Sequence, residues 1–190
     1  MADAAFRNWT ELRDAGVVRQ RRDFSCGLAS LATLLHHYFG LPVTEDALLD
    51  RLLARDGRRT ANDEMREHGV SLADLAWLAG SFGVASAGLE LPLESLLELD
   101  RPVIAYLEQD GLSHFAVLRG AQEHAGALLA DPAAGNRRVS LRQLRRWFAL
   151  APRGLGRILV FRPPGHVTPD PGYFGFEARD ALLEPRAVVR

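Results

Sequence analysis

The sequence predicts an α+β fold, with helices in its first half and antiparallel strands in its second half. Up to about residue 99, apolar residues recur at the spacing of one helix face. After Pro102 the pattern changes to short apolar runs separated by turn residues, which is typical of strands. Helices followed by strands indicate that the helices pack on an antiparallel sheet.

Four helices are expected before the strands, over residues 24–39, 44–54, 71–82 and 91–99. The first carries leucines and aromatic residues at helical spacing and ends at Gly40. Thr44 is a typical N-cap for the second helix, and Ser71 with Asp74 forms a capping box for the third. The polar residues 55–67 are interpreted as loop or fraying helix.

Four strands are expected in the second half, over residues 103–107, 115–119, 127–130 and 157–161. The first three are separated by Asp110-Gly111, Gly120 and Gly126, and such residues favour the turns of an antiparallel meander. Before the last strand, Ser140 and Gln143 predict a capped helix through residue 148.

Length and composition predict one main domain. The chain has 190 residues, of which 47% are apolar, and a chain of this size buries roughly 70% of its unfolded surface. We assign residues 17–162 to this domain, residues 1–16 to an N-terminal extension and residues 163–190 to a tail rich in proline and glycine.

The composition excludes several classes of protein. A net charge of −1 gives no overall electrostatic reason to bind nucleic acid or an anionic membrane. One cysteine cannot form an internal disulfide, and it excludes a structural zinc site. No apolar stretch reaches the about 18 residues that a membrane span needs, and the start lacks a signal-peptide profile. Because a chain with its export signal removed would look the same, the compartment stays open between periplasm and cytoplasm.

Cys26 is the first candidate for chemistry, because it stands where the first long helix is expected to begin. Unpaired N–H groups and the helix dipole favour a thiolate there, which is the form that attacks a carbonyl carbon. Gly27 would permit a close approach at this point. The alternative interpretation is a small buried apolar residue, as free cysteines often are.

His114 and Asp131 are candidates for a base and for the acid that orients it. His114 begins an apolar strand and Asp131 closes the next one, so adjacent antiparallel strands would bring the two together. The alternatives are a histidine on the rim of the sheet and an aspartate that starts a turn before Pro132.

Gln20 lies six residues before Cys26, and its amide could donate to a developing oxyanion. Together with the backbone N–H of Cys26 it would supply two preorganised donors, as acyl transfer requires. The alternative is an exposed polar residue within the basic segment 19–22.

Other candidate constellations are weaker. His36 and His37 are adjacent on a helix, so their side chains diverge by about 100° and cannot chelate one ion. No nucleotide-binding fingerprint is present, and we expect no metal, no nucleotide and no other cofactor. A basic strip is interpreted as a solvated helix face; it consists of Arg137, Arg138, Arg142, Arg145 and Arg146.

Three blocks of the sequence, residues 20–32, 114–120 and 131–135, resemble the double-glycine leader peptidase family in content and order. These are papain-like cysteine peptidases, best known as the N-terminal domain of bacteriocin-exporting transporters, and the resemblance covers residues 17–161. It implies a papain-like fold and cleavage of a peptide after a Gly-Gly pair. By matching motifs it implies Cys26 as nucleophile, His114 as base, Asp131 as orienting acid and Gln20 as oxyanion donor.

The chain departs from the family pattern in two respects. The family often has aspartate directly before the cysteine, where this chain has Ser25, and no transporter follows the domain in this sequence. Stand-alone relatives occur beside secretion systems, including those that export functional amyloid, and residues 23–40 resemble that group. This resemblance implies export to the periplasm and a protein substrate in the secretion pathway.

Two rivals to a peptidase remain open at the level of sequence. A peptidase-like binding module would grip a leader peptide or a secretion partner without cutting it. An enzyme with the same acyl-enzyme chemistry could instead act as an amidase, a transglutaminase-like enzyme or a thioesterase, because function depends on the site and its pockets. The presence of all four site residues favours an enzyme over the binding module, and the other acyl-transfer substrates stay open. The sequence leaves the oligomeric state open.

Overall fold

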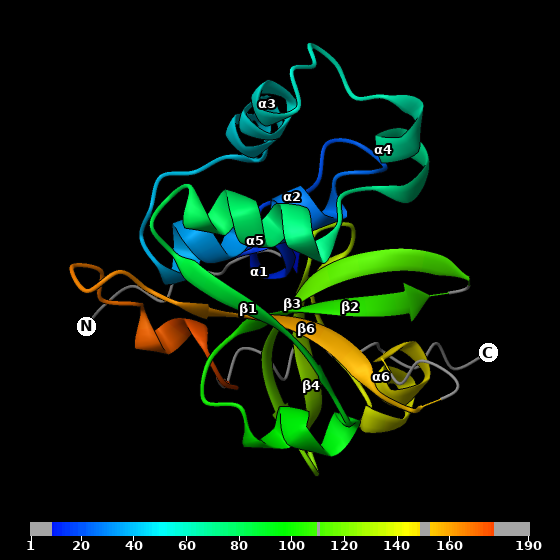
Figure 1. The fold of residues 1–190 in the computed structure, drawn as a ribbon. Helices are drawn as coiled ribbons and strands as arrows, with labels where there is room; N and C mark the ends of the chain where they lie inside the picture. The colour runs from blue at the N-terminus through cyan, green and yellow to red at the C-terminus, as the bar shows by residue number, and fades with distance from the viewer. Residues whose placement is uncertain (1–8, 110, 149–152, 177–190) are drawn as a thin grey trace.

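A six-stranded antiparallel sheet forms the centre of the molecule (Figure 1). The computed structural model describes residues 9–109, 111–148 and 153–176. The strands are β1 (Ala85–Leu91), β2 (Val103–Gln109), β3 (Leu112–Gln122), β4 (Gly126–Asp131), β5 (Gly135–Val139) and β6 (Gly156–Arg162). Their order across the sheet is β1-β6-β2-β3-β4-β5, and every neighbouring pair is antiparallel.

Helices cover both faces of this sheet. The helical elements are α1 (Trp9–Asp14), α2 (Cys26–Thr33), the π-helix η1 (Leu34–Tyr38), α3 (Glu45–Arg55), α4 (Asp63–His68), α5 (Leu72–Gly80), the 3-10 helix η2 (Leu93–Glu98), α6 (Leu141–Phe148) and the 3-10 helix η3 (Pro171–Tyr173). In Figure 1, α2 and α5 lie above the sheet, with α3 beyond them, and α6 lies below it. The sheet is therefore the middle layer of three.

Each face of the sheet has its own apolar core. Leu28 and Leu31 of α2 lie in one core, together with Ile104 from the sheet. Leu144 and Phe148 of α6 lie in the other core, with η2 and the opposite face of the strands. Because α2 packs against β3, the first core holds the N-terminus of α2 beside the strand that begins near His114.

The predicted α+β architecture is confirmed, and most predicted elements are present. Thr44 caps α3 through a hydrogen bond from Ala47 N to its Oγ1 (3.2 Å), and Ser71 and Asp74 form the expected capping box of α5. The long helix expected over residues 24–39 is present as α2 followed by η1. Residues 91–99 contain a 3-10 helix rather than an α-helix, and the stretch 55–67 contains the start of the short helix α4.

Two strands were not expected from the sequence, β1 and β5. Both are edge strands. Most of β1 is exposed, and β5 reads Gly-Asn-Arg-Arg-Val, so neither shows the alternation of apolar and polar residues that predicts a strand. Their backbone pairing with β6 and β4 defines them instead.

The segment that follows β6 packs near the end of η1, which is the end of the α2–η1 helix opposite Cys26. Asp170 N donates to Tyr38 O (2.8 Å), and the Tyr173 hydroxyl donates to Gly16 O (2.9 Å). The Tyr173 side chain is buried. Residues 177–190 of the expected tail lie outside the described residues, and the domain limits drawn from the sequence stay a prediction.

Candidate active site

Cys26 is the first residue of α2, as the sequence predicts, and it is half-buried. Ser30, one turn along the helix, donates from Oγ to Phe115 O (3.1 Å) and ties α2 to β3. Gly27 makes this close approach possible, because a Cβ there would lie 2.6 Å from Val70 Cγ2 and 3.1 Å from the Phe115 ring. Any larger residue at position 27 would clash with Val70 and with Phe115 of β3, and would displace the start of α2.

The turn before Cys26 is closed by Ser25, the residue at which the chain departs from the family pattern. Ser25 is fully buried; its Oγ donates to Arg22 O (2.8 Å) and accepts from Arg22 N (3.2 Å). A short hydroxyl therefore satisfies both backbone groups of one residue and fixes where the helix begins.

His114 and Asp131 lie in contact beside Cys26. His114 Nε2 and Asp131 Oδ1 are 3.1 Å apart, and the side chains are 14% and 2% exposed. On its other side His114 interacts with the Cys26 side chain. The pairing of β3 with β4 brings the start of one strand beside the end of the other, as the sequence predicts. Three residues from separate parts of the chain thus lie together, with the hydrogen bond between His114 and Asp131 joining two of them.

This arrangement changes the proton affinities of the histidine and the aspartate. Burial alone would lower the pKa of His114, but hydrogen bonds and charge interactions with Asp131 and Cys26 raise it to about 9. Burial alone would raise the pKa of Asp131, but His114, Arg137 and a backbone N–H hold it below its usual range. At neutral pH, His114 is therefore an imidazolium and Asp131 a carboxylate.

Asp131 is bonded through both of its carboxylate oxygens. Besides His114, Oδ1 accepts from Ala133 N (2.8 Å) and Ala134 N (3.1 Å), so Asp131 also forms the turn that an Asp-Pro pair predicts. Oδ2 pairs with Arg137 Nη2 at 2.7 Å. Asp131 therefore forms the turn and pairs with the histidine at the same time.

Gln20 lies against the turn that follows Asp131. Its backbone N–H donates to Pro132 O (3.0 Å), and Arg19 Nε donates to the same oxygen (3.1 Å). The side-chain Nε2 donates one hydrogen to Arg22 O (3.0 Å), while the buried Oε1 has no partner. Gln20 therefore joins the turn after Asp131 to the loop before Cys26.

The comparisons with known proteins identify the family of the chain. The sequence profile of the peptidase C39 family matches residues 14–151. The chain belongs to the peptidase C39 family. The resemblance to double-glycine leader peptidases and the prediction of a cysteine peptidase class are thereby confirmed at the level of the family.

Two relatives of this C39 chain are described as a probable functional amyloid protease, FapD. The one from Pseudomonas aeruginosa is 34% identical over 153 residues, which are 77% of this chain and 65% of the relative. The one from Pseudomonas fluorescens is 33% identical over 175 residues, 92% of this chain and 68% of the relative. This chain therefore spans about two thirds of the length of these relatives.

A solved structure of similar fold is a double-glycine motif protease from an AMS/PCAT transporter, in complex with the leader peptide. It is 26% identical to the C39 chain with a TM-score of 0.59, over 78% of this chain and 91% of the other. The predicted fold, helices packed on an antiparallel sheet, is thus the fold of a C39 peptidase domain.

The loop before Cys26 is held by the start of α3. Glu45, which is 2% exposed, accepts from Arg21 N (3.0 Å) and from Arg22 Nη1 (3.2 Å). Asp46 accepts from the same Arg22 nitrogen at 2.8 Å. Two acidic residues in the first turn of α3 therefore hold the chain segment between Gln20 and Cys26 in place.

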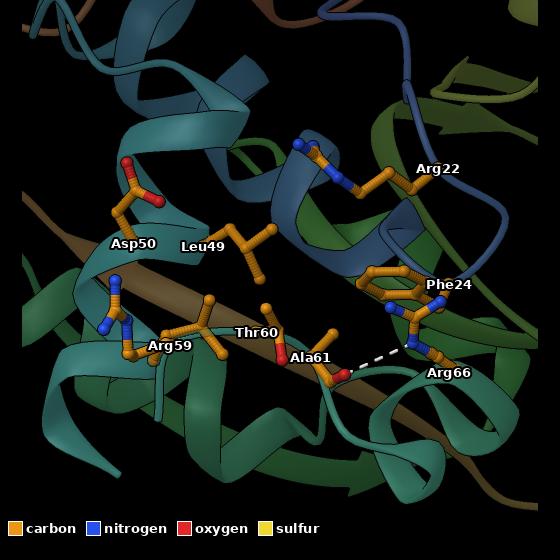
Figure 2. Close-up of a pocket in the computed structure, with 9 residues that line it drawn as sticks. Arg22, Phe24, Leu49, Asp50, Arg59, Thr60, Ala61 and Arg66 are labelled. Carbon is orange, nitrogen blue, oxygen red and sulfur yellow. Dashed lines mark hydrogen bonds between the residues drawn. The ribbon is translucent and has the colours of Figure 1, made fainter. Parts of the chain in front are cut away.

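A pocket of about 410 Å³ opens beside this loop (Figure 2). It is lined by Arg22, Phe24, Leu49, Asp50, Leu53, Arg59, Thr60, Ala61 and Arg66. Its apolar lining comes from α3 and from Phe24, two residues before Cys26, and three arginines stand around it against one aspartate. Arg66 is fixed by a hydrogen bond from Nε to Ala61 O (3.2 Å).

The basic strip interpreted as one solvated helix face is divided between two elements. Arg137 and Arg138 lie on β5, and only the remaining three lie on α6. The interpretation was wrong for Arg137, which pairs with Asp131. A signal for this was the hairpin register: Asp131 faces Gly135 and Leu129 faces Arg137, so Arg137 lies on the same face as Asp131.

The remaining histidines do not join the site. His36 is exposed, and His37 is half-buried with its ring stacked on Tyr173 at 6.4 Å. Within the described residues no group of three or more His, Cys, Asp or Glu side chains could hold a metal ion. In the same part of the chain, every helix is too short or too polar to cross a membrane.

Proposed function

We propose that this C39 chain is a cysteine endopeptidase that cuts a protein of a secretion pathway after a Gly-Gly pair. The observation that carries the proposal is the grouping of Cys26, the first residue of α2, with His114, which interacts with its side chain and is hydrogen-bonded to Asp131. A nucleophile, a base and a group that orients the base are the parts that acyl transfer through a covalent intermediate requires.

In the first half of the reaction the Cys26 thiolate attacks the carbonyl carbon of the scissile peptide. The oxyanion that forms accepts from the Cys26 backbone N–H and from the second Nε2 hydrogen of Gln20. The His114 imidazolium gives its proton to the leaving amine, the C–N bond breaks, and a thioester remains on Cys26.

In the second half His114, now neutral, takes a proton from a water molecule that attacks the thioester carbonyl. The C–S bond breaks, the new carboxylic acid leaves, and Cys26 and His114 return to the thiolate–imidazolium pair. Asp131 holds the His114 ring in place through both steps. It stays a carboxylate, because its pKa lies below the usual range.

The names of the relatives and the pocket beside Phe24 support a peptide substrate. Two relatives are described as a functional amyloid protease, and a similar fold was solved in complex with a leader peptide. The pocket is lined by Phe24 and two leucines of α3 together with three arginines and one aspartate, and it opens beside the loop before Cys26, which suits an apolar substrate side chain with an acidic neighbour.

The test is cleavage of synthetic peptides that contain one internal Gly-Gly pair, followed by mass spectrometry. We expect a cut after the second glycine, no cut by Cys26→Ser, and no cut in a matched peptide with the second glycine replaced by valine. Cleavage by Cys26→Ser at the rate of the unaltered enzyme would overturn the proposal. Tight binding of the Gly-Gly peptide without any cleavage would favour the rival binding module.

A further inference from the structure

We propose that Arg137 is a positioning residue for the reaction: through Asp131 it fixes the orientation and the charge balance of His114. This inference rests on the proposed function, since it assigns a role around the same His114–Asp131 pair. Arg137 contacts neither Cys26 nor His114 in the hydrogen bonds of the described structure, so its influence passes through Asp131.

Arg137 is held in place by three elements besides its own strand. Its Nη2 lies 2.7 Å from Asp131 Oδ2 on β4 and donates to Gln109 Oε1 on β2 at 3.1 Å. Its guanidinium carbon lies 4.8 Å from the centre of the Trp147 ring on α6. A planar cation fixed on an aromatic face and at two acceptors has one defined position, which a solvated surface arginine lacks.

The two oxygens of Asp131 divide their partners in a way that gives Arg137 a specific task. Oδ1 receives His114 and two backbone N–H groups, whereas Oδ2 receives Arg137. Asp131 is 1% exposed, so without Arg137 its Oδ2 would lose the charged partner that the structure gives it. The carboxylate could then turn towards its other donors, and the His114 ring would lose its fixed direction.

Arg137 also sets the charge that His114 meets. The titratable or charged groups around the pair are Cys26 from α2, Asp131 from β4, Arg137 from β5 and, at the Pro132 carbonyl, Arg19 from the segment before α2. Arg137 neutralises part of the Asp131 charge. Without it the imidazolium would be the main counter-charge of a buried carboxylate and would keep its proton to higher pH.

The proposed role of Arg137 predicts a different measurement from simple stabilisation of the fold. If Arg137 only joined α6 and β5 to the sheet, its removal would change the free energy of unfolding and leave the midpoint of the His114 titration unaltered. If Arg137 acts through Asp131, its removal must raise that midpoint even where the protein stays folded.

The test compares Arg137→Met, Arg137→Lys and Arg145→Met. Methionine keeps an aliphatic chain against Trp147 but removes the charge, and lysine restores the charge without the planar fork. Arg145→Met is the matched control, because it removes an arginine of α6 whose ion pair with Glu94 (2.6 Å) is exposed. Two measurements are made on folded protein: the NMR titration of the His114 ring, assigned with His114→Ala, and the pH dependence of Cys26 alkylation by iodoacetamide.

We expect Arg137→Met to raise the midpoint of the His114 titration by about one pH unit, and Arg137→Lys to restore most of it. The alkylation profile should shift in the same direction, and Arg145→Met should change neither. Unchanged titration in a folded Arg137→Met protein would overturn the inference, whatever its melting temperature.

Neither measurement needs a peptide substrate. The proposed role of Arg137 and the proposed peptidase function can therefore be contradicted independently of each other. A shifted titration with no peptide cleavage would retain Arg137 as a positioning residue and contradict the peptidase. Where Gly-Gly peptides are cut, we expect Arg137→Met to lower kcat about tenfold at pH 7 with little change in KM, as for a lost orienting contact.

Discussion

The two ends of β3 each bury a cation, and the partners of these cations differ. At one end His114 faces the Asp131 carboxylate. At the other end Arg119, which is 3% exposed, donates from Nε to Tyr173 O (2.9 Å) and from Nη1 to Asn136 Oδ1 (3.1 Å). The Tyr173 ring lies 4.6 Å from its guanidinium carbon.

Unpaired polar atoms gather at only one of these two ends. In the described part of the chain, three buried side-chain atoms lack a partner: Gln20 Oε1, Gln109 Nε2 and Arg137 Nε. Each belongs to a residue within one or two contacts of Asp131. The polar groups of Arg119 are bonded within the fold, whereas the three atoms without a protein partner lie on the side of Asp131 and His114.

The largest expected difference between the two ends concerns catalysis. His114→Ala should lower the rate of peptide cleavage by about 10²–10⁴, because it removes the proposed acid and base. The matched control is His124→Ala, at an exposed position in the turn between β3 and β4. The measurement is kcat on a Gly-Gly peptide; equal losses for the two variants would contradict the assignment.

The far end should respond in stability rather than in rate. Tyr173→Ala removes a buried ring, the stack on Arg119 and the bond to Gly16 O, and should lower the free energy of unfolding by about 3–5 kcal/mol. The measurement is urea unfolding. Below the melting transition kcat should be unchanged, and a selective loss of kcat with normal stability would remove the distinction between the ends.

The oxyanion role of Gln20 should appear in kcat alone. Gln20→Ala should lower kcat by about 10²–10³, the usual effect of losing one oxyanion donor. Gln122→Ala, at an exposed position near the far end of β3, is the control. If kcat of Gln20→Ala equals that of the control, Gln20 only ties the nucleophile loop to the Asp131 turn.

The pH dependence sharpens the same comparison. Because the pKa of His114 is raised to about 9, the imidazolium that protonates the leaving amine persists through neutral pH and is lost above it. The alkaline limb of kcat/KM should therefore have its midpoint near pH 9, with a fall of about tenfold per pH unit beyond it. A midpoint at the ordinary histidine value would show that Asp131 does not support His114 in solution.

The sequence predicts the site better than it predicts the sheet. Helical periodicity and the caps at Thr44 and Ser71 locate the helices, and the start of α2 at Cys26 follows from the same pattern. The placement of His114 and Asp131 follows from the ends of two apolar strands. Local patterns of this kind agree with the folded structure, because in natural sequences local preferences are consistent with the global fold.

What the sequence does not predict depends on contacts between distant segments. The edge strand β5 is polar, so its residues resemble the helix that follows, and Arg137 is hidden within an apparently solvated basic strip. The contacts of Gln20 with Pro132 and with Arg22 also depend on how loops meet, which no local pattern records. Pairing register assigns the position of Arg137, and the meeting of two loops assigns that of Gln20.

The position of β6 bears on when the enzyme becomes active during its synthesis. This strand fills the gap between β1 and β2, although it is the last of the six in the chain. Residues 26, 114 and 131 all leave the ribosome before the strand that completes the sheet. A nascent chain of this length therefore exposes an unfinished core, and we expect proteolytic activity to arise only after residue 162 has been added. The order of the strands thus makes the completion of the sheet around residues 26, 114 and 131 depend on its last strand.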